Sequence, residues 1–128
     1  MFRDGRALVA RRARPPLLGL YSLPGGVVEI GERLEAAALR ELAEEVGVVA
    51  EILGFNRHVE SIERDARGVR WHYVIASFVA RWIAGEPRAS EEAEAPLWID
   101  PRAMSGVPTT PGLEETLEGA VRLFEAAR

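Results

Sequence analysis

Glutamates at helical spacing are the residues of this sequence best suited to chemistry. Glu41, Glu44 and Glu45 share one face of a helix, because a helix turns by about 100° per residue. Like charges at this spacing destabilise a helix by roughly a few tenths of a kcal/mol per pair, and the helix dipole disfavours anions near its C-terminal end. Converging carboxylates are ligands of Mg²⁺ or Mn²⁺, whose charge would offset this repulsion. A solvated acidic face is the alternative, since glutamate is a good helix former.

The residues around these glutamates predict a short helix that is fixed at both ends. The pattern becomes helical at Gly31 or Glu32 and continues to Val46, with an apolar stripe opposite the acidic face, and Gly47 ends it. Before it, Gly25 and Gly26 let the backbone come close to a ligand and aim carbonyl oxygens at a cation. We therefore expect a rigid acidic element beside a close-approach loop.

The remaining elements predict an α/β fold. Residues 6–12 form a strand candidate, and residues 51–64 and 69–83 predict two longer strands joined by a hairpin turn at 65–68. The second of these is apolar on both faces, which predicts a central strand covered on both sides. A polar connection leads to a brief strand at 97–100, and residues 109–128 predict a second helix. Together they predict helices on both faces of one sheet.

Composition limits the classes of protein this chain can belong to. The 128 residues, 48% of them hydrophobic, suffice for one core, so we expect a single domain over residues 1–128. The net charge of −4 without a basic stripe disfavours a nucleic-acid partner. The absence of cysteine excludes disulfides and zinc–thiolate sites and fits a cytoplasmic location. No apolar run approaches the roughly 20 residues of a membrane span, so no membrane partner is expected.

The glutamate segment resembles the Nudix hydrolase signature. It matches that signature at every defined position: Gly26, Glu32, Arg40, Glu41, Leu42, Glu44, Glu45, Gly47 and Val48. The flanking GLYSLPGG, the hairpin and the region of Trp98 are also similar to Nudix hydrolases, so the resemblance covers most of the chain. It implies an α/β/α sandwich around a mixed β-sheet. Family members generally begin with a longer strand than MFRDGRALVA allows, so we expect a short first strand.

The resemblance implies a divalent-metal-dependent hydrolase of a nucleoside diphosphate linked to another group. Glu44 and Glu45 would bind Mg²⁺ or Mn²⁺, with the Gly25 carbonyl oxygen as a further ligand. Glu41 would bind metal directly or through water, or act as the base, and Arg40 would orient it. The family role of Gly26 is to support this loop.

Two acidic positions keep alternatives open. Glu32 would bind a metal-bound water or brace the loop. The general base is either Glu41 or an acidic residue outside the signature, for which the polar connection offers Glu91, Glu92 and Glu94. Glu92 fits best because it precedes Trp98 by six residues in the sequence. The alternative is that this loop is only a solvated charged segment.

The substrate is less well defined by the sequence. YSLPGG, RDARGVRWHYV and GEPRAS resemble the ADP-ribose pyrophosphatase-like branch, whose members split ADP-ribose into AMP and ribose 5-phosphate. Tyr21, Arg12 and His72 are candidate substrate contacts. The alternative for Tyr21 is packing in the core, that for Arg12 is a solvated strand end, and that for His72 is packing within its strand. The expected substrate is ADP-ribose or another nucleotide sugar. Alternatives are hydrolysis of damaged nucleoside triphosphates or dinucleoside polyphosphates, or a nucleotide-binding sensor without catalysis. The resemblance also allows a homodimer.

Overall fold

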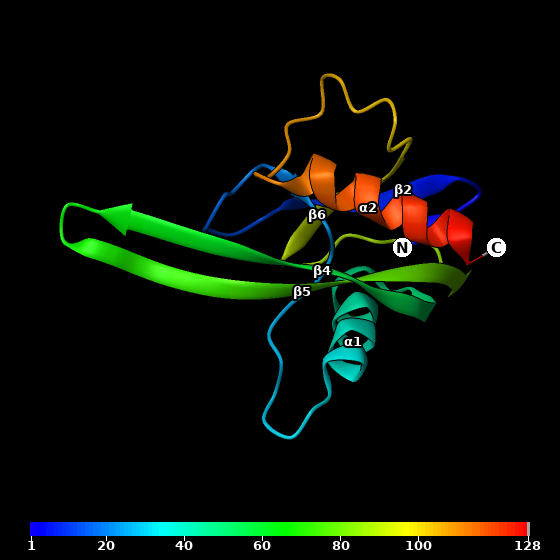
Figure 1. The fold of residues 1–128 in the computed structure, drawn as a ribbon, viewed down its shortest axis with the longest axis horizontal. Coiled ribbons are helices and arrows are strands. Elements are labelled where there is room, and N and C mark those ends of the chain that lie inside the picture. Colours follow the sequence, from blue (N-terminus) through cyan, green and yellow to red (C-terminus); the bar gives the residue numbers. More distant parts are fainter. Residues whose placement is uncertain (128) are drawn as a thin grey trace.

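The computed structural model describes residues 1–127 as two helices and one mixed sheet (Figure 1). The helices are Leu34–Val46 (α1) and Leu113–Ala126 (α2). The strands are Phe2–Arg3 (β1), Arg6–Arg12 (β2), Tyr21–Ser22 (β3), Val49–Asp65 (β4), Gly68–Ala84 (β5) and Ala93–Ile99 (β6). The expected α/β/α arrangement is confirmed.

The sheet has the order β3-β2-β1-β5-β4, and β6 also pairs with β2. β1 and β5 are parallel, whereas β2 runs antiparallel to β1, β3 and β6. The short β1 therefore joins the β4–β5 hairpin to the rest of the sheet. No helix within residues 1–127 has both the length and the apolar character needed to cross a membrane.

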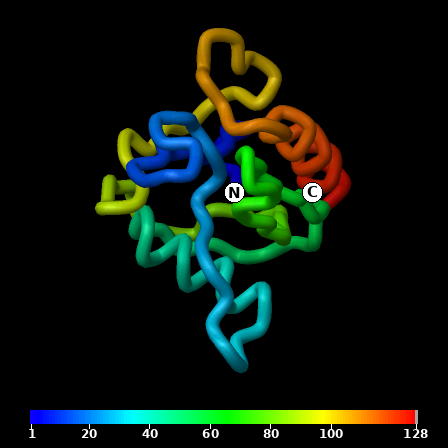
Figure 2. Tube along the Cα trace, turned by 90° about the vertical axis from the view of Figure 1, so that its left-hand side faces the viewer, coloured from blue at the N-terminus to red at the C-terminus, as the bar shows by residue number. Residues whose placement is uncertain are grey.

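The helices lie on opposite faces of this sheet (Figures 1 and 2). Side chains alternate along β2, so Val9 packs in the core beneath α2 while Leu8 packs in the core beneath α1. Leu117 of α2 and Val46 of α1 are buried at the centres of these two cores. Each helix is thus held by an apolar stripe, which leaves its opposite side for other uses.

The long hairpin departs from the sequence prediction. Val79 and Ala80 of β5 are buried beneath the helices, as a central strand requires. The other half of β5, before Ser77, is exposed and pairs only with β4 in a two-stranded arm that extends beyond both helices (Figure 1). The prediction that the whole strand is covered on both faces is wrong, because apolar alternation does not say how far the helices reach.

Candidate active site

Helix α1 begins later than the sequence predicted, and its start places Glu32 in the preceding loop. The helix begins at Leu34, its N-cap Arg33 makes no side-chain capping bond, and Gly31 has a positive φ of 83°. A turn from Glu29 to Glu32 occupies the predicted first helical residues, with the Glu32 N–H donating to the Glu29 carbonyl oxygen at 3.0 Å. Glu32 therefore stands at the end of a loop that can bend back over the helix.

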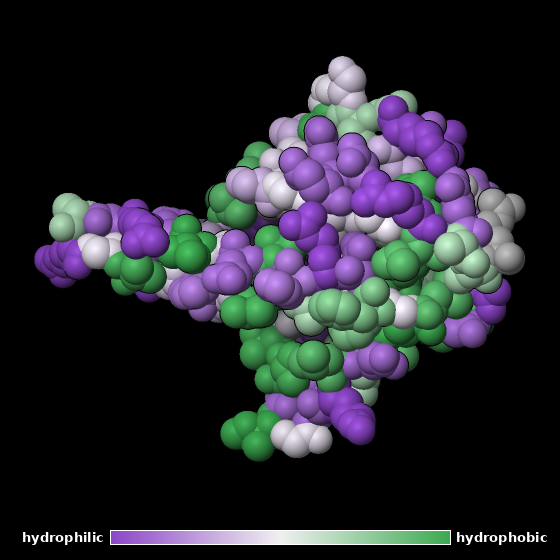
Figure 3. All heavy atoms as spheres, in the orientation of Figure 1, coloured by the Kyte–Doolittle hydropathy of each residue, from purple (hydrophilic) through white to green (hydrophobic). Residues whose placement is uncertain are grey.

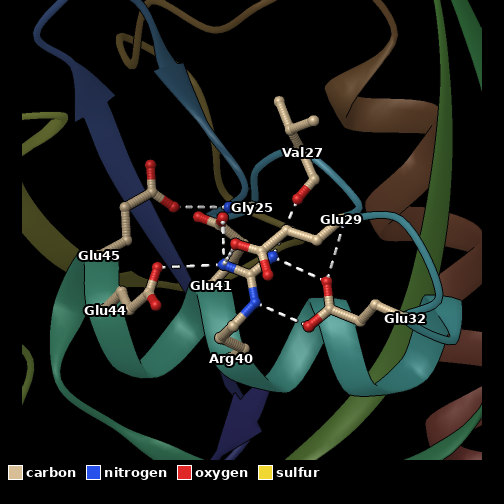
Figure 4. Close-up of polar contacts among 8 residues, drawn as sticks. All are labelled: Gly25, Val27, Glu29, Glu32, Arg40, Glu41, Glu44 and Glu45. Atoms are coloured by element: carbon tan, nitrogen blue, oxygen red, sulfur yellow. Dashed lines mark hydrogen bonds and ion pairs between the residues drawn. The ribbon is translucent and has the colours of Figure 1, made fainter.

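Arg40 is the hub of the polar face of α1 (Figure 4). Its guanidinium donates two hydrogen bonds to Glu32, at 2.7 and 2.8 Å, and one to Glu41 at 2.7 Å. It also donates to Glu44 at 3.1 Å and to the Val27 carbonyl oxygen at 2.9 Å. The hydrogen bond from Arg40 lowers the pKa of Glu32 to about 2, and these carboxylates raise the pKa of Arg40. One cation therefore ties loop 26–33 to the helix.

The Gly-Gly turn lies directly against the acidic face. The Gly25 N–H donates to Glu45 Oε2 at 2.7 Å (Figure 4). A Cβ added at Gly26 would lie 2.2 Å from Glu41 Oε2, far closer than atoms can approach. At Gly25 an added Cβ would meet nothing within 4 Å. A side chain at position 26 would therefore displace the Glu41 carboxylate from its place against the turn.

An acidic recess of about 270 Å³ opens beside this turn. Its lining residues are Glu41, Glu44, Glu45, Ser90, Glu91 and Glu92. The pKa of Glu45 is raised to about 7, chiefly by burial and also by the charges of Glu92 and Glu41, although the Gly25 hydrogen bond and the charge of Arg12 lower it. Carboxylates from two distant segments of the chain therefore repel one another across one recess.

The loop that carries Glu91 and Glu92 is attached to the end of α1. Gly47 ends the helix in the left-handed region with φ 72°, and the Arg88 N–H donates to the Val46 carbonyl oxygen at 2.9 Å. The Arg88 guanidinium covers Gly47, where an added Cβ would lie 2.6 Å from Nη1. Gly85 packs on the Gly47 carbonyl oxygen in the same way. Sequence reasoning missed Arg88, and the only signal for it was Gly47, against which its guanidinium packs.

The recess has the donor chemistry of a divalent-cation site. Within residues 1–127 no three acidic or histidine side chains already stand at metal-binding positions, because Arg40 holds Glu41 and Glu44. Yet four carboxylates, Glu41, Glu44, Glu45 and Glu92, surround one open volume, and burial together with the charges of Glu92 and Glu41 raises the pKa of Glu45. Hard oxygen ligands with excess negative charge are what Mg²⁺ or Mn²⁺ requires. The residues present fit such an ion.

Of the predicted substrate contacts, the structure brings only Arg12 toward the recess. Arg12 ends β2, donates from Nε to the Pro16 carbonyl oxygen at 2.6 Å, and its charge lowers the pKa of Glu45. Tyr21 lies on β3 and packs against the core beneath α2, on the other side of the sheet from the glutamates. The ring is partly buried there.

His72 and Glu94 lie elsewhere. His72 is on the β4–β5 arm, where Nε2 is 2.8 Å from Glu60 Oε2, and the structure does not bring it to the acidic recess. Glu94 was predicted in a loop but belongs to β6, and it accepts a hydrogen bond from Arg11 at 3.1 Å. Pairing of β6 with β2 begins at Ala93, so the polar connection ends at Glu92 and the strand starts before the predicted residues 97–100.

Comparisons with known proteins agree with this geometry. The NUDIX domain model matches residues 1–122. ADP-ribose pyrophosphatase of Methanocaldococcus jannaschii is 34% identical over 98 residues, covering 77% of this chain but only 56% of that protein. Putative 8-oxo-dGTP diphosphatase 2 of Mycobacterium tuberculosis is 34% identical over 127 residues, covering 92% of this chain and 86% of that protein. The crystal structure of a MutT NUDIX hydrolase from Burkholderia pseudomallei superposes with a TM-score of 0.81 at 33% identity, covering 93% and 91% of the two chains.

Proposed function

The chain belongs to the NUDIX domain family, and we propose that it hydrolyses a nucleoside diphosphate linked to another group, with ADP-ribose as the first candidate. The observation that supports this most is the acidic recess, in which three glutamates of one helix meet Glu92 of a distant loop. A diphosphate is itself anionic, so it can enter such a recess only with cations between it and the carboxylates. A metal-dependent reaction at a diphosphate explains how an anionic substrate could bind beside the carboxylates of the recess.

Glu41, Glu44 and Glu45 would hold Mg²⁺ or Mn²⁺, with the exposed Gly25 carbonyl oxygen as a further ligand. When bound, such an ion neutralises the diphosphate oxygens and acidifies the attacking water. The protein supplies the fixed positions of these oxygens. Arg40 keeps the Glu41 carboxylate against Gly26, and Glu32 holds Arg40 in turn through two hydrogen bonds.

Glu92 is our candidate for the general base. Glu41 already accepts a hydrogen bond from Arg40, and Glu91 forms an ion pair with Arg14 at 3.3 Å. The Glu92 side chain lines the recess and, within residues 1–127, takes part in no hydrogen bond or ion pair. Its oxygens are therefore available to accept a proton from water positioned for attack on phosphorus.

Arg12 would contribute on the substrate side. Its hydrogen bond to Pro16 fixes the guanidinium near Glu45, and its remaining N–H groups can donate to phosphate oxygens. A guanidinium in this place would hold the part of the diphosphate that leaves the recess.

A damaged nucleoside triphosphate is the second candidate substrate. The observation that favours it is coverage, because the Mycobacterium relative named for 8-oxo-dGTP aligns with more of this chain than the Methanocaldococcus relative does. Both substrates contain the diphosphate unit that the recess would bind, so the two differ in the groups attached to it.

A substrate panel tests the proposal. ADP-ribose, 8-oxo-dGTP, a dinucleoside polyphosphate and unmodified triphosphates would each be incubated with Mg²⁺ or Mn²⁺, and the products separated by chromatography. We expect AMP and ribose 5-phosphate from ADP-ribose and no turnover in EDTA. Turnover that persists in EDTA would overturn the metal mechanism, and tight nucleotide binding without any turnover would identify a sensor instead.

A further inference from the structure

The β4–β5 arm is the largest part of the molecule that the proposed reaction does not use. It extends away from the body of the protein as a narrow ribbon (Figure 1), and Figure 2 shows it end-on. Its surface carries hydrophobic side chains among hydrophilic ones (Figure 3). Its strands pair with each other from Arg57↔Ser77 to Asp65↔Gly68, and no further strand within residues 1–127 pairs with them there. A two-stranded hairpin is marginally stable in water on its own, so this arm is better suited to a packed state.

The arm has one apolar face, continuous with the core beneath α2. Side chains alternate along β5, and Val79 faces α2, so Ile75, Tyr73 and Trp71 lie on the same face as Val79. Cross-strand pairing adds Val59, which lies opposite Ile75. Tyr73 is 52% exposed and Ile75 is 49% exposed. An apolar surface of this kind marks an interaction site.

The other face of the arm mixes charged and apolar side chains. There Glu60 and His72 interact at 2.8 Å, and Ile62 and Val74 alternate with them. The two faces therefore differ in chemistry, and a partner would cover the face that continues from α2.

Two charges at opposite ends of the apolar face indicate what this partner is. Arg57 pairs with Ser77 at the base of the arm, and Glu63 pairs with Trp71 near its tip, so both share the face of Tyr73. Within residues 1–127 neither side chain has a hydrogen-bond or ion-pair partner. A cation at one end and an anion at the other make this face complementary to a reversed copy of itself.

We propose that two copies of this chain associate through these faces, with the arms antiparallel. The tip of each arm then lies over the base of the other, and Arg57 of each copy meets Glu63 of the second copy. The apolar side chains between these charges are covered by their own counterparts. This is an isologous two-fold contact, which closes after two copies.

The first turn of α2 adds to the complementarity. The Asn56 side chain at the base of the arm donates to the Thr116 carbonyl oxygen at 2.9 Å, so α2 starts close to that base. Its first turn carries Glu114 and Glu115, which are exposed. The turn at the arm tip carries Arg67, so a reversed arm brings basic residues toward acidic ones.

Analytical ultracentrifugation of the full chain tests the association. We expect a dimer at micromolar concentrations and a monomer for Tyr73→Lys, which places a charge in the apolar face. Val74→Lys is the matched control, because Val74 is 68% exposed on the opposite face of the same strand and should leave the dimer intact. A monomeric wild-type chain, or equal loss of the dimer in both variants, would overturn the proposal.

Charge reversal tests the reversed alignment of the arms. Arg57→Glu puts two glutamates opposite each other at both ends and should weaken association at least about tenfold. Glu63→Arg in the same chain restores opposite charges, so the double variant should recover wild-type association. If the double variant is weaker than Arg57→Glu alone, the two side chains do not meet.

Cross-linking gives a readout that does not depend on the stability of the variants. The chain has no cysteine, so Ser61→Cys places a single thiol near the middle of the proposed contact. A short bis-maleimide should join two copies of this variant, whereas Val74→Cys on the other face should remain uncrosslinked. Equal cross-linking of the two variants would contradict arm-on-arm packing.

Discussion

The two helices are alike in sequence character and differ in what surrounds their polar sides. Each buries an apolar stripe against one face of the sheet, each carries several glutamates, and neither has a side-chain N-cap. On α1, Glu41, Glu44 and Glu45 are contacted by Arg40 or by the Gly25 N–H. On α2, Glu118 points into solvent and, within residues 1–127, has no polar partner.

The difference lies in the neighbouring loops. A Gly-Gly turn packs against α1, and the Arg88 contact with Gly47 attaches a second acidic loop to its end. Within residues 1–127, α2 meets one loop cation, Arg102, which pairs with Glu125, while Glu114, Glu115 and Glu118 are exposed without a polar side-chain partner. Glutamates at helical spacing therefore form a site only where the fold brings backbone and further carboxylates to them.

Neutralising one glutamate on each helix tests this contrast most strongly. Glu44→Gln should lower kcat on the best substrate of the panel by roughly 10²- to 10³-fold, because it removes a charged ligand that supports the transition state. Glu118→Gln on α2 should leave kcat unchanged. Similar rates for the two variants would remove α1 from the chemistry.

The Gly-Gly turn offers the next comparison. Gly26→Ala should lower kcat by about 10- to 100-fold, because the new methyl group displaces the Glu41 carboxylate by more than a small adjustment can absorb. Gly25→Ala is the matched control, since its Cβ meets open space, and its effect should be several-fold smaller. Steady-state kinetics with Mg²⁺ measure both. Equal losses would show that the turn needs flexibility and not close approach.

Arg40 can be compared with Arg102, which forms an ion pair with Glu125 on α2. Arg40→Lys should lower kcat by about tenfold and measurably lower the free energy of unfolding, because lysine cannot bind Glu32 with two parallel hydrogen bonds while also reaching Glu41. Arg102→Lys should change the free energy of unfolding by less than about 0.5 kcal/mol, as is usual for exposed ion pairs. Urea unfolding monitored by circular dichroism separates the two. If Arg40→Lys changes neither kcat nor the free energy of unfolding, Arg40 does not position Glu32 and Glu41.

The pH dependence of stability gives the smallest expected effect. In the protein without metal, the pKa of Glu45 is raised from its usual 4.5 to about 7, so between these values the folded state keeps a proton that the unfolded chain has released. The free energy of unfolding should therefore fall as pH rises through this window, by on the order of 1 kcal/mol since the side chain is partly solvated.

Glu45→Gln should remove that slope. Glu32 has the opposite effect on the free energy of unfolding, and at lower pH. Its pKa is lowered to about 2, so its stabilising contribution is present above pH 4.5 and is lost as pH falls below that value. Urea unfolding in EDTA at several pH values checks both signs. A slope unchanged in Glu45→Gln would assign it to other groups.

The sequence predicted the fold better than the extent of its parts. The helical spacing of apolar residues places both helices, and the α/β/α arrangement is confirmed. The first turn of α1 was misplaced because Glu32 is held by Arg40, a contact between distant residues that local propensity does not contain. The sequence predicts that β5 is covered along its whole length, because the alternation of its side chains is the same whether or not a helix lies above the strand.

The site could be predicted in part for similar reasons. Spacing on one helix placed Glu41, Glu44 and Glu45 together, since helix geometry alone decides it. Glu92 was predicted only through the family resemblance and Arg88 was missed, because both come from a loop whose path depends on how the end of α1 meets β5. Tyr21 packs in a core instead, because its strand edge faces α2.

The Arg40 hub also has a consequence for the order in which the active protein is assembled. Its guanidinium lies among Glu29, Glu32, Glu41 and Glu44 and serves as an internal counterion. The chain can therefore fold and order loop 26–33 in a metal-poor environment. A cation that arrives later meets oxygens that are already confined, so its affinity is not reduced by the entropy of ordering that loop.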